Sequence, residues 1–105
     1  MAENKDIILM IKNSIKAIVP NAKIILYGSF ARGENDLESD IDILILIDKK
    51  VVTRYDEKKI KYPLYDIEFD TGQIISPLVL SKQAWETRHK ITPFYYNVTK
   101  EGIVL

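Results

Sequence analysis

Two aspartates separated by one residue, Asp40 and Asp42, lie just before the apolar run 43–47. Side chains at positions i and i+2 of a β-strand share a face, about 6.5–7 Å apart along it, so both carboxylates should point the same way. Two carboxylates aimed together repel unless a cation separates them, and carboxylate oxygens are ligands that suit Mg²⁺. Asp40 and Asp42 are therefore candidate metal ligands, and metal ions held in this way can assist a phosphoryl displacement.

Gly28 and Ser29 offer the complementary chemistry. They follow the apolar run 24–27 and precede a segment, 30–33, that fits one helical turn. A strand that ends in Gly-Ser before a helical turn exposes backbone N–H groups that can bind phosphate. Glycine lets a phosphate approach the backbone closely, and serine adds a hydroxyl donor. We therefore expect phosphate binding at Gly28 and Ser29, with an ordinary capped turn as the alternative.

Further polar residues surround these motifs. Arg32 and Ser39 are further candidates for the nucleotide-binding site. Arg32 can contact a bound phosphate, or else faces solvent, and Ser39 can cap or orient the adjacent Asp40, or else serves the loop. Six acidic residues and no Lys or Arg lie between Glu34 and Asp48, although the whole chain balances 15 basic with 15 acidic residues. A local acidic concentration in a neutral chain indicates a cation, with a solvated acidic loop as the alternative for its first half. The neutral balance gives no indication of nucleic-acid binding.

The hydrophobic pattern predicts the elements that position these motifs. Helical spacing, β-branched apolar runs and a capping-box pattern at Thr53 together indicate an α/β (α+β) protein. Helices between strands favour crossover connections, and a small mixed sheet flanked by helices is equally compatible. The predicted order is helix 5–19, strand 23–27, helical turn 30–33, strand 40–48, helix 53–72, strand 74–80 and helix 81–86.

The segment 65–70 supports two interpretations. Helical spacing continues through it, but its apolar and acidic residues also alternate with the period of a half-buried strand. We prefer the helix, and the strand remains the alternative. The choice matters because it decides the position of three acids, Asp66, Glu68 and Asp70.

The two motifs together carry a family resemblance. Gly-Ser-Phe-Ala-Arg-Gly at 28–33, followed by Ser-Asp-Ile-Asp at 39–42 and an apolar strand, resembles the signature of the polymerase β nucleotidyltransferase superfamily, in particular its minimal nucleotidyltransferases. The signature covers 28–47, and the order of elements extends the similarity to about residue 80. The resemblance implies phosphate binding at Gly28 and Ser29, and Mg²⁺ binding at Asp40 and Asp42 during transfer of a nucleoside monophosphate.

One feature departs from that family. Its full active site has a third carboxylate on the strand after the second helix, but the strand predicted there, 74–80, contains no acid. If 65–70 forms a strand, Asp66, Glu68 or Asp70 can complete the site. If it forms a helix, these acids belong to a solvated face and only two metal carboxylates remain. The difference bears on activity, because a third acid commonly activates the acceptor hydroxyl.

The resemblance also implies a function and a partner. It implies a Mg²⁺-dependent nucleotidyltransferase that moves AMP from ATP, or another nucleoside monophosphate from its NTP, to an acceptor. Several stand-alone members resemble antitoxins paired with a helical HEPN toxin, which implies a protein partner that supplies or covers the acceptor. The alternative is a catalytically weak or inactive binding module that neutralises a HEPN-type partner by contact, and the missing acid in 74–80 favours it.

Length and composition add outer bounds. A chain of 105 residues is expected to form one domain, 1–105. The longest uninterrupted apolar runs, 7–11 and 43–47, are five residues each, against roughly 20 for a membrane span. The first residues lack the layout of a signal peptide and the chain has no cysteine, so we expect a cytoplasmic protein with no membrane contact.

Basic residues gather just after the second predicted strand. A solvated helix face is the expected explanation, and docking of a partner or acceptor is the alternative. The residues are Lys49, Lys50, Arg54, Lys58, Lys59 and Lys61.

Overall fold

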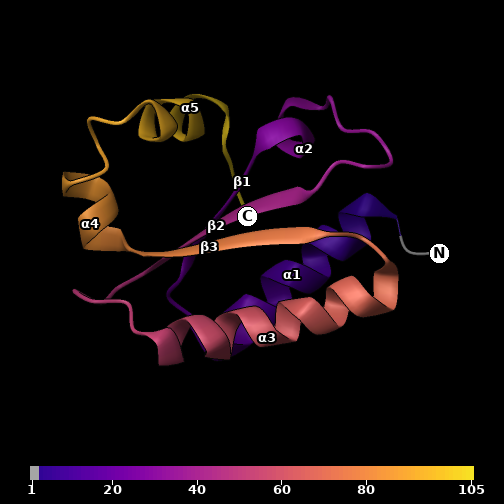
Figure 1. Cartoon of the computed structure of the whole chain (residues 1–105), viewed down its shortest axis with the longest axis horizontal. Coiled ribbons are helices and arrows are strands. Elements are labelled where there is room, and N and C mark those ends of the chain that lie inside the picture. The colour runs from indigo at the N-terminus through magenta and orange to yellow at the C-terminus, as the bar shows by residue number, and fades with distance from the viewer. Residues whose placement is uncertain (1–2) are drawn as a thin grey trace.

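The computed structural model describes residues 3–105, which form a four-stranded sheet with helices on both sides (Figure 1). Met1 and Ala2, which the predicted domain 1–105 includes, lie outside the described residues. Within residues 3–105, no helix is long and apolar enough to cross a membrane. The elements are α1 (Asn4–Ile18), β1 (Lys23–Tyr27), α2 (Gly28–Arg32), β2 (Ile41–Ile47), α3 (Arg54–Thr71), β3 (Ile75–Ser81), α4 (Lys82–Thr87), α5 (Pro93–Glu101) and β4 (Ile103–Val104).

The sheet is mixed, with the strand order β3-β2-β1-β4. β1 runs antiparallel to β2 and places Tyr27 opposite Asp42, whereas β3 runs parallel to β2 and places Ser76 opposite Asp42. A parallel pair needs a crossover connection, which α3 provides. The prediction of an α+β fold with a small mixed sheet is therefore confirmed. β3 lies at an edge, which agrees with Pro77 in it, because proline cannot donate a ladder hydrogen bond.

The side chains of β2 divide between the two faces of the sheet. The alternate isoleucines from Ile41 to Ile47 are buried in the core that α1 and α3 cover. Leu44 and Leu46 are buried on the opposite face with Trp85. Figure 1 shows α1 and α3 together on one side of the sheet and α4 and α5 on the other. Because residues two apart in a strand share a face, Asp42 belongs to the side of α4 and α5.

Residues 65–70 lie in α3, so the helix prediction is confirmed and the strand alternative is wrong. The buried side chains of α3 are Ile60, Leu64 and Ile67, which follow helical spacing. Tyr65 and Phe69, which a half-buried strand would place with Ile67, are exposed instead. Three inward positions at helical spacing are enough to dock α3 on the sheet, and tertiary packing decides between two periods that the sequence leaves open.

The C-terminal segment forms α5 and β4, which the sequence pattern did not predict as elements. The ring of Phe94 packs edge-on against Tyr27 and Trp85, with centroids 5.3 and 5.6 Å apart. After β4 pairs with β1, the backbone N–H of Leu105 donates to the carbonyl oxygen of Ile24 at 2.9 Å. The end of the chain therefore closes the face of the sheet that carries Asp42.

α3 begins at a capping box formed by Thr53 and Asp56. The N–H of Asp56 donates to Thr53 Oγ1 at 3.1 Å, and the N–H of Thr53 donates to Asp56 Oδ2 at 3.0 Å. The hydrogen bond from the Thr53 backbone, followed by that from Lys49, lowers the pKa of Asp56 to about 2. A carboxyl with a lowered native pKa stabilises the fold above its unfolded value, roughly pH 4, and this stabilisation is lost as the pH falls toward 2.

We expect Thr53→Ala to lower the free energy of unfolding by about 1 kcal/mol at pH 7, because one helix N-terminal N–H loses its acceptor. The difference from the wild type should be nearly the same at pH 3, because the backbone N–H of Thr53 and Lys49, the main causes of the lowered pKa of Asp56, remain in the variant. Urea denaturation at pH 7 and pH 3 measures the loss at both pH values. The control is Thr99→Ala, at an exposed position of α5. An equal loss of stability in the two variants would contradict the capping role.

Candidate active site

The turn from β1 into α2 lies against the carboxylate of Asp42. Tyr27, the last residue of β1, is the ladder partner of Asp42, so Gly28 follows directly beside it. Gly28 has a φ of +73°, which residues with a side chain rarely adopt. A Cβ at Gly28 would also overlap the Asp42 carboxylate. The structure thus brings together the two motifs that the sequence separates by a loop.

Asp40 and Asp42 face the side of the sheet opposite the α1–α3 core. Ile41 between them is fully buried in that core, so its neighbours point the other way. Burial raises the pKa of Asp42, the nearby charge of Asp40 raises it further, and Arg32 lowers it. An ionised Asp42 is therefore electrostatically costly in the chain alone, and a bound cation would offset that cost. Two carboxylates on one face fit a hard divalent ion such as Mg²⁺.

Ser76 on β3 is the third member of this row. It is the ladder partner of Asp42 in the parallel pair, and its Oγ donates a hydrogen bond to Asp40 Oδ2 at 3.3 Å. This bond helps to orient the Asp40 carboxylate. β3 contains no acidic residue. The strand on which the resemblance implies a third carboxylate therefore offers this site a hydroxyl.

The three acids considered for the missing carboxylate lie on α3, which covers the opposite face of the sheet. Glu68 Oε1 accepts the backbone N–H of Ile75 at 2.8 Å and so fixes the start of β3. Asp66 and Asp70 are exposed. Among residues 3–105, no group of three or more His, Cys, Asp or Glu side chains is placed to hold a metal ion. The acidic part of the site consists of Asp40 and Asp42.

Ser29 and Arg32 lie at the two ends of α2. Ser29 is in the first turn, where backbone N–H groups have no acceptor within the helix. Arg32 pairs through Nε with Glu34 at 3.3 Å and through Nη1 with Glu101 at 3.2 Å. The second ion pair ties α2 to α5. Both carboxylates raise the pKa of Arg32, mainly through the hydrogen bond to Glu101.

A pocket of about 280 Å³ opens between α2 and α5 beside these groups. Gly28 and Arg32 line it from α2, and Phe94, Asn97 and Glu101 line it from α5. Aromatic surface next to polar side chains is typical of ligand pockets. The C-terminal segment therefore supplies one wall next to the Gly28 turn.

Ser39 lies in the loop before Asp40, and its hydroxyl is used inside that loop. Its Oγ accepts the N–H of Asp36 at 3.0 Å and donates to Asp36 Oδ1 at 3.3 Å. Its carbonyl oxygen accepts from Gln73 Nε2 at 2.8 Å. Of the two roles expected for Ser39, the structure displays the loop role.

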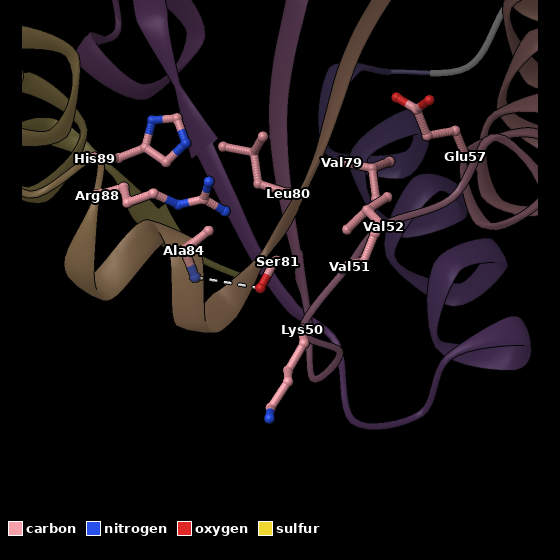
Figure 2. A pocket seen from close by; sticks show the side chains of 10 residues that line it. All are labelled: Lys50, Val51, Val52, Glu57, Val79, Leu80, Ser81, Ala84, Arg88 and His89. Carbon is pink, nitrogen blue, oxygen red and sulfur yellow. Dashed lines mark hydrogen bonds between the residues drawn. The ribbon is translucent and has the colours of Figure 1, made fainter.

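A larger cavity, of about 620 Å³, lies at the other end of β2 and β3. Figure 2 shows its lining between the start of α3 and α4, with Lys50 extending away from the other side chains and Ser81 accepting the N–H of Ala84. Ser81 is five strand positions beyond Ser76, or about 16 Å along β3. This cavity is therefore separate from the row of Asp40, Asp42 and Ser76.

Sequence reasoning missed Ser76 and the wall formed by α5. Alternation along β3 places Ser76 on the same face as Leu78 and Leu80, but only the parallel register with β2 puts it beside Asp42. The aromatic residues before the C-terminus were a usable signal for α5. Their packing against Tyr27 depends on the paired sheet.

The chain belongs to the nucleotidyltransferase domain family, whose model matches residues 8–100. "Putative protein adenylyltransferase MJ0141" of Methanocaldococcus jannaschii is 36% identical over 80 residues, which cover 73% of this chain and 79% of that protein. "Putative protein adenylyltransferase MJ0604" of the same organism is 37% identical over 86 residues, which cover 79% of this chain and 76% of that protein. The family resemblance of the two motifs is confirmed.

Two solved structures share the fold. One is described as the crystal structure of the toxin-antitoxin with AMP-PNP, with a TM-score of 0.65 and 18% identity over 97% of this chain and 72% of that chain. The other is described as a "putative nucleotidyltransferase" from Sulfolobus solfataricus, with a TM-score of 0.54 and 19% identity over 95% of this chain and 82% of that chain. These similarities confirm the α+β fold.

The close approach at Gly28 predicts that a single methyl group there disturbs Asp42. We expect Gly28→Ala to lower the free energy of unfolding by more than Gly33→Ala, the matched control. Gly33 has a similar φ of +71° but has no atom within 4 Å of an added Cβ. Both variants carry the left-handed backbone cost of about 1–2 kcal/mol, and Gly28→Ala adds the displacement of the carboxylate. Equal losses in urea denaturation would contradict the contact.

Proposed function

We propose that this protein is a Mg²⁺-dependent nucleotidyltransferase that transfers AMP from ATP to an acceptor hydroxyl on a partner protein. The observation that carries the proposal is the close approach of Gly28 to the Asp42 carboxylate, because it puts the turn proposed to bind phosphate next to the proposed metal ligands. Membership of the nucleotidyltransferase family supports the reaction class. The adenylyltransferase names of the two relatives support AMP as the transferred group.

In this reaction the acceptor oxygen forms a bond to the α-phosphorus of ATP. The bond from that phosphorus to the oxygen bridging to the β-phosphorus breaks, pyrophosphate leaves, and the hydroxyl proton passes to water. Gly28 and Ser29 would hold the phosphates through backbone N–H groups and the serine hydroxyl. Asp40 and Asp42 would hold Mg²⁺, which when bound neutralises phosphate charge. Ser76 keeps Asp40 oriented through its hydrogen bond.

Arg32 has two roles in this proposal, one structural and one in phosphate binding. Its ion pair with Glu101 fixes α2 against α5, and it lines the pocket beside Gly28. The guanidinium is within the same pocket as the turn that would bind phosphate, so it is also a candidate phosphate contact. Exchange of Glu101 for a phosphate oxygen would be the event that engages it.

The acceptor is proposed to come from a second protein, of the helical HEPN type. The structural neighbour described as a toxin-antitoxin with AMP-PNP supports a nucleotide and a protein partner together. The open character of the site in this chain agrees with that arrangement, because Asp40 and Asp42 remain partly exposed at the surface. ATP is the proposed substrate and Mg²⁺ the proposed cofactor.

A second function, neutralisation of that partner by contact, is favoured by one observation. β3 brings Ser76 and no carboxylate to the row of Asp40 and Asp42. Without a third acid, no side chain in this row is a strong base for the acceptor hydroxyl. A protein of this kind would bind nucleotide and cover its partner while transferring AMP slowly or not at all.

We expect Asp42→Asn to reduce AMP transfer by about 100-fold or more, because the loss of one carboxylate charge weakens both Mg²⁺ binding and charge stabilisation. Transfer of label from [α-³²P]ATP to the co-purified partner measures it. Asp48→Asn is the matched control, since Asp48 is exposed just past the other end of β2. Wild-type transfer by Asp42→Asn would show that the reaction uses other residues.

The double variant Asp40→Asn/Asp42→Asn separates the two functions. If the protein acts as an enzyme, the variant should bind the partner with unchanged affinity but fail to neutralise it. If it acts by contact, neutralisation should persist in full. Isothermal titration of the pair, together with an assay of partner activity, gives both readouts.

A further inference from the structure

The outward face of α3 carries four large aromatic side chains. Tyr55, Tyr62 and Phe69 recur every seven residues and Tyr65 lies between the last two. Their exposed fractions are 72%, 57%, 89% and 43% in the order Tyr55, Tyr62, Phe69 and Tyr65. Helix positions at spacings of three, four and seven share one face. We call this set of four residues the aromatic stripe of α3.

The aromatic stripe lies on the face opposite to the one that α3 buries. The mean direction of the inward residues Ile60, Leu64 and Ile67 is about half a turn away from that of the outward ones, given 100° per residue. The fold of the chain therefore does not need the stripe. A groove of about 420 Å³ lies beside the first half of the stripe, lined by Tyr55, Lys58, Lys59, Tyr62 and Pro63. In Figure 1, α3 forms an outer edge of the molecule. The exposed fractions of the four side chains show that the stripe is accessible to solvent.

Charge along α3 is divided between its two halves. The exposed basic residues Arg54, Lys58 and Lys59 lie before Tyr62, and the exposed acidic residues Asp66 and Asp70 lie after it. Among the ion pairs of residues 3–105, none involves these five side chains. The two acids in the first half have their own partners, since Asp56 pairs with Lys49 and Glu57 with Lys61. The free charge is therefore positive at one end of the stripe and negative at the other.

We infer that the aromatic stripe binds a second copy of this chain, with the two α3 helices antiparallel about a two-fold axis at Tyr62. A two-fold interface must be complementary to itself. An antiparallel pair sets the basic half of each helix against the acidic half of the other, whereas a parallel pair would set like charges together. A heptad stripe is the pattern by which two helices interdigitate side chains.

The positions match in this arrangement. Tyr55 and Phe69 lie at equal distances on either side of Tyr62, so Tyr55 of one copy meets Phe69 of the other, and the two Tyr62 rings meet at the axis. Lys59 of one copy lies opposite Asp66 of the other, on the same side of the stripe. The groove beside Tyr62 receives an aromatic ring of the second copy. Antiparallel helix dipoles add a small favourable term.

The size of the stripe sets the expected affinity. Four side chains with these exposures offer roughly 500 Å² of exposed surface per copy. This is below the roughly 800 Å² that each partner buries in a standard stable interface. The dimer should therefore be reversible, with a dissociation constant in the micromolar range. It leaves the row of Asp40, Asp42 and Ser76 open, because that row faces the other side of the sheet.

Sedimentation equilibrium of the full chain between 5 and about 500 μM tests the inference. We expect a concentration-dependent monomer–dimer equilibrium for the wild type. Asp66→Lys alone and Lys58→Glu/Lys59→Glu alone should each weaken it at least about tenfold, because each change sets like charges opposite one another. A one-to-one mixture of the two variants should form a heterodimer, since each then carries the complement of the other.

Circular dichroism and thermal unfolding verify that each variant is folded, which is expected because the changed side chains are exposed. The matched control is Lys12→Glu on α1, a charge reversal away from the stripe, which should leave association unchanged. A wild type that stays monomeric at 500 μM, a dimer unaffected by either charge change, or variants that do not complement each other would overturn the inference. In the first of these outcomes the stripe serves a different partner.

Discussion

At the end of β1 the backbone turns with a positive φ at Gly28, and the space that a side chain would fill there is taken by the carboxylate of Asp42. This contact links β1 and β2 where β1 ends and β2 begins, next to the polar groups of both strands. It fixes the distance between the backbone N–H groups that follow Gly28 and the acidic pair on β2. The arrangement depends on the antiparallel register that sets Tyr27 beside Asp42. Any proposed chemistry of the site rests on that spacing.

The alternation of β2 explains how so small a chain supports both a core and a site. Its isoleucines face α1 and α3 and make up much of the main core. Its other face carries Asp42, next to Asp40 just before the strand, and continues with Leu44 and Leu46, which α4 and α5 cover. One strand therefore anchors the fold on one side and presents carboxylates on the other. The edge strand β3 adds Ser76 to the same row.

The polar motifs could be predicted because their chemistry is local. Gly28 with Ser29, and Asp40 with Asp42, are recognised from neighbours in the sequence, and each lies where its strand begins or ends. The helix at 65–70 could only be preferred, because Tyr65 and Phe69 fit both a helical and an alternating period. Packing of Ile60, Leu64 and Ile67 against the sheet decides it. β4 is two residues long and exists only as a partner of β1, so no local pattern indicates it.

In the proposed function, nucleotide and metal meet between the Gly28 turn and the two aspartates. The most direct test is a crystal structure of the protein with AMP-PNP and Mn²⁺ as a stand-in for Mg²⁺, with anomalous scattering to locate the ion. We expect an anomalous peak bonded to carboxylate oxygens of both Asp40 and Asp42, with the α-phosphate beside the backbone of Gly28 and Ser29. A peak elsewhere, or a nucleotide bound instead in the larger cavity beside Ser81 and Ala84, would contradict this proposal.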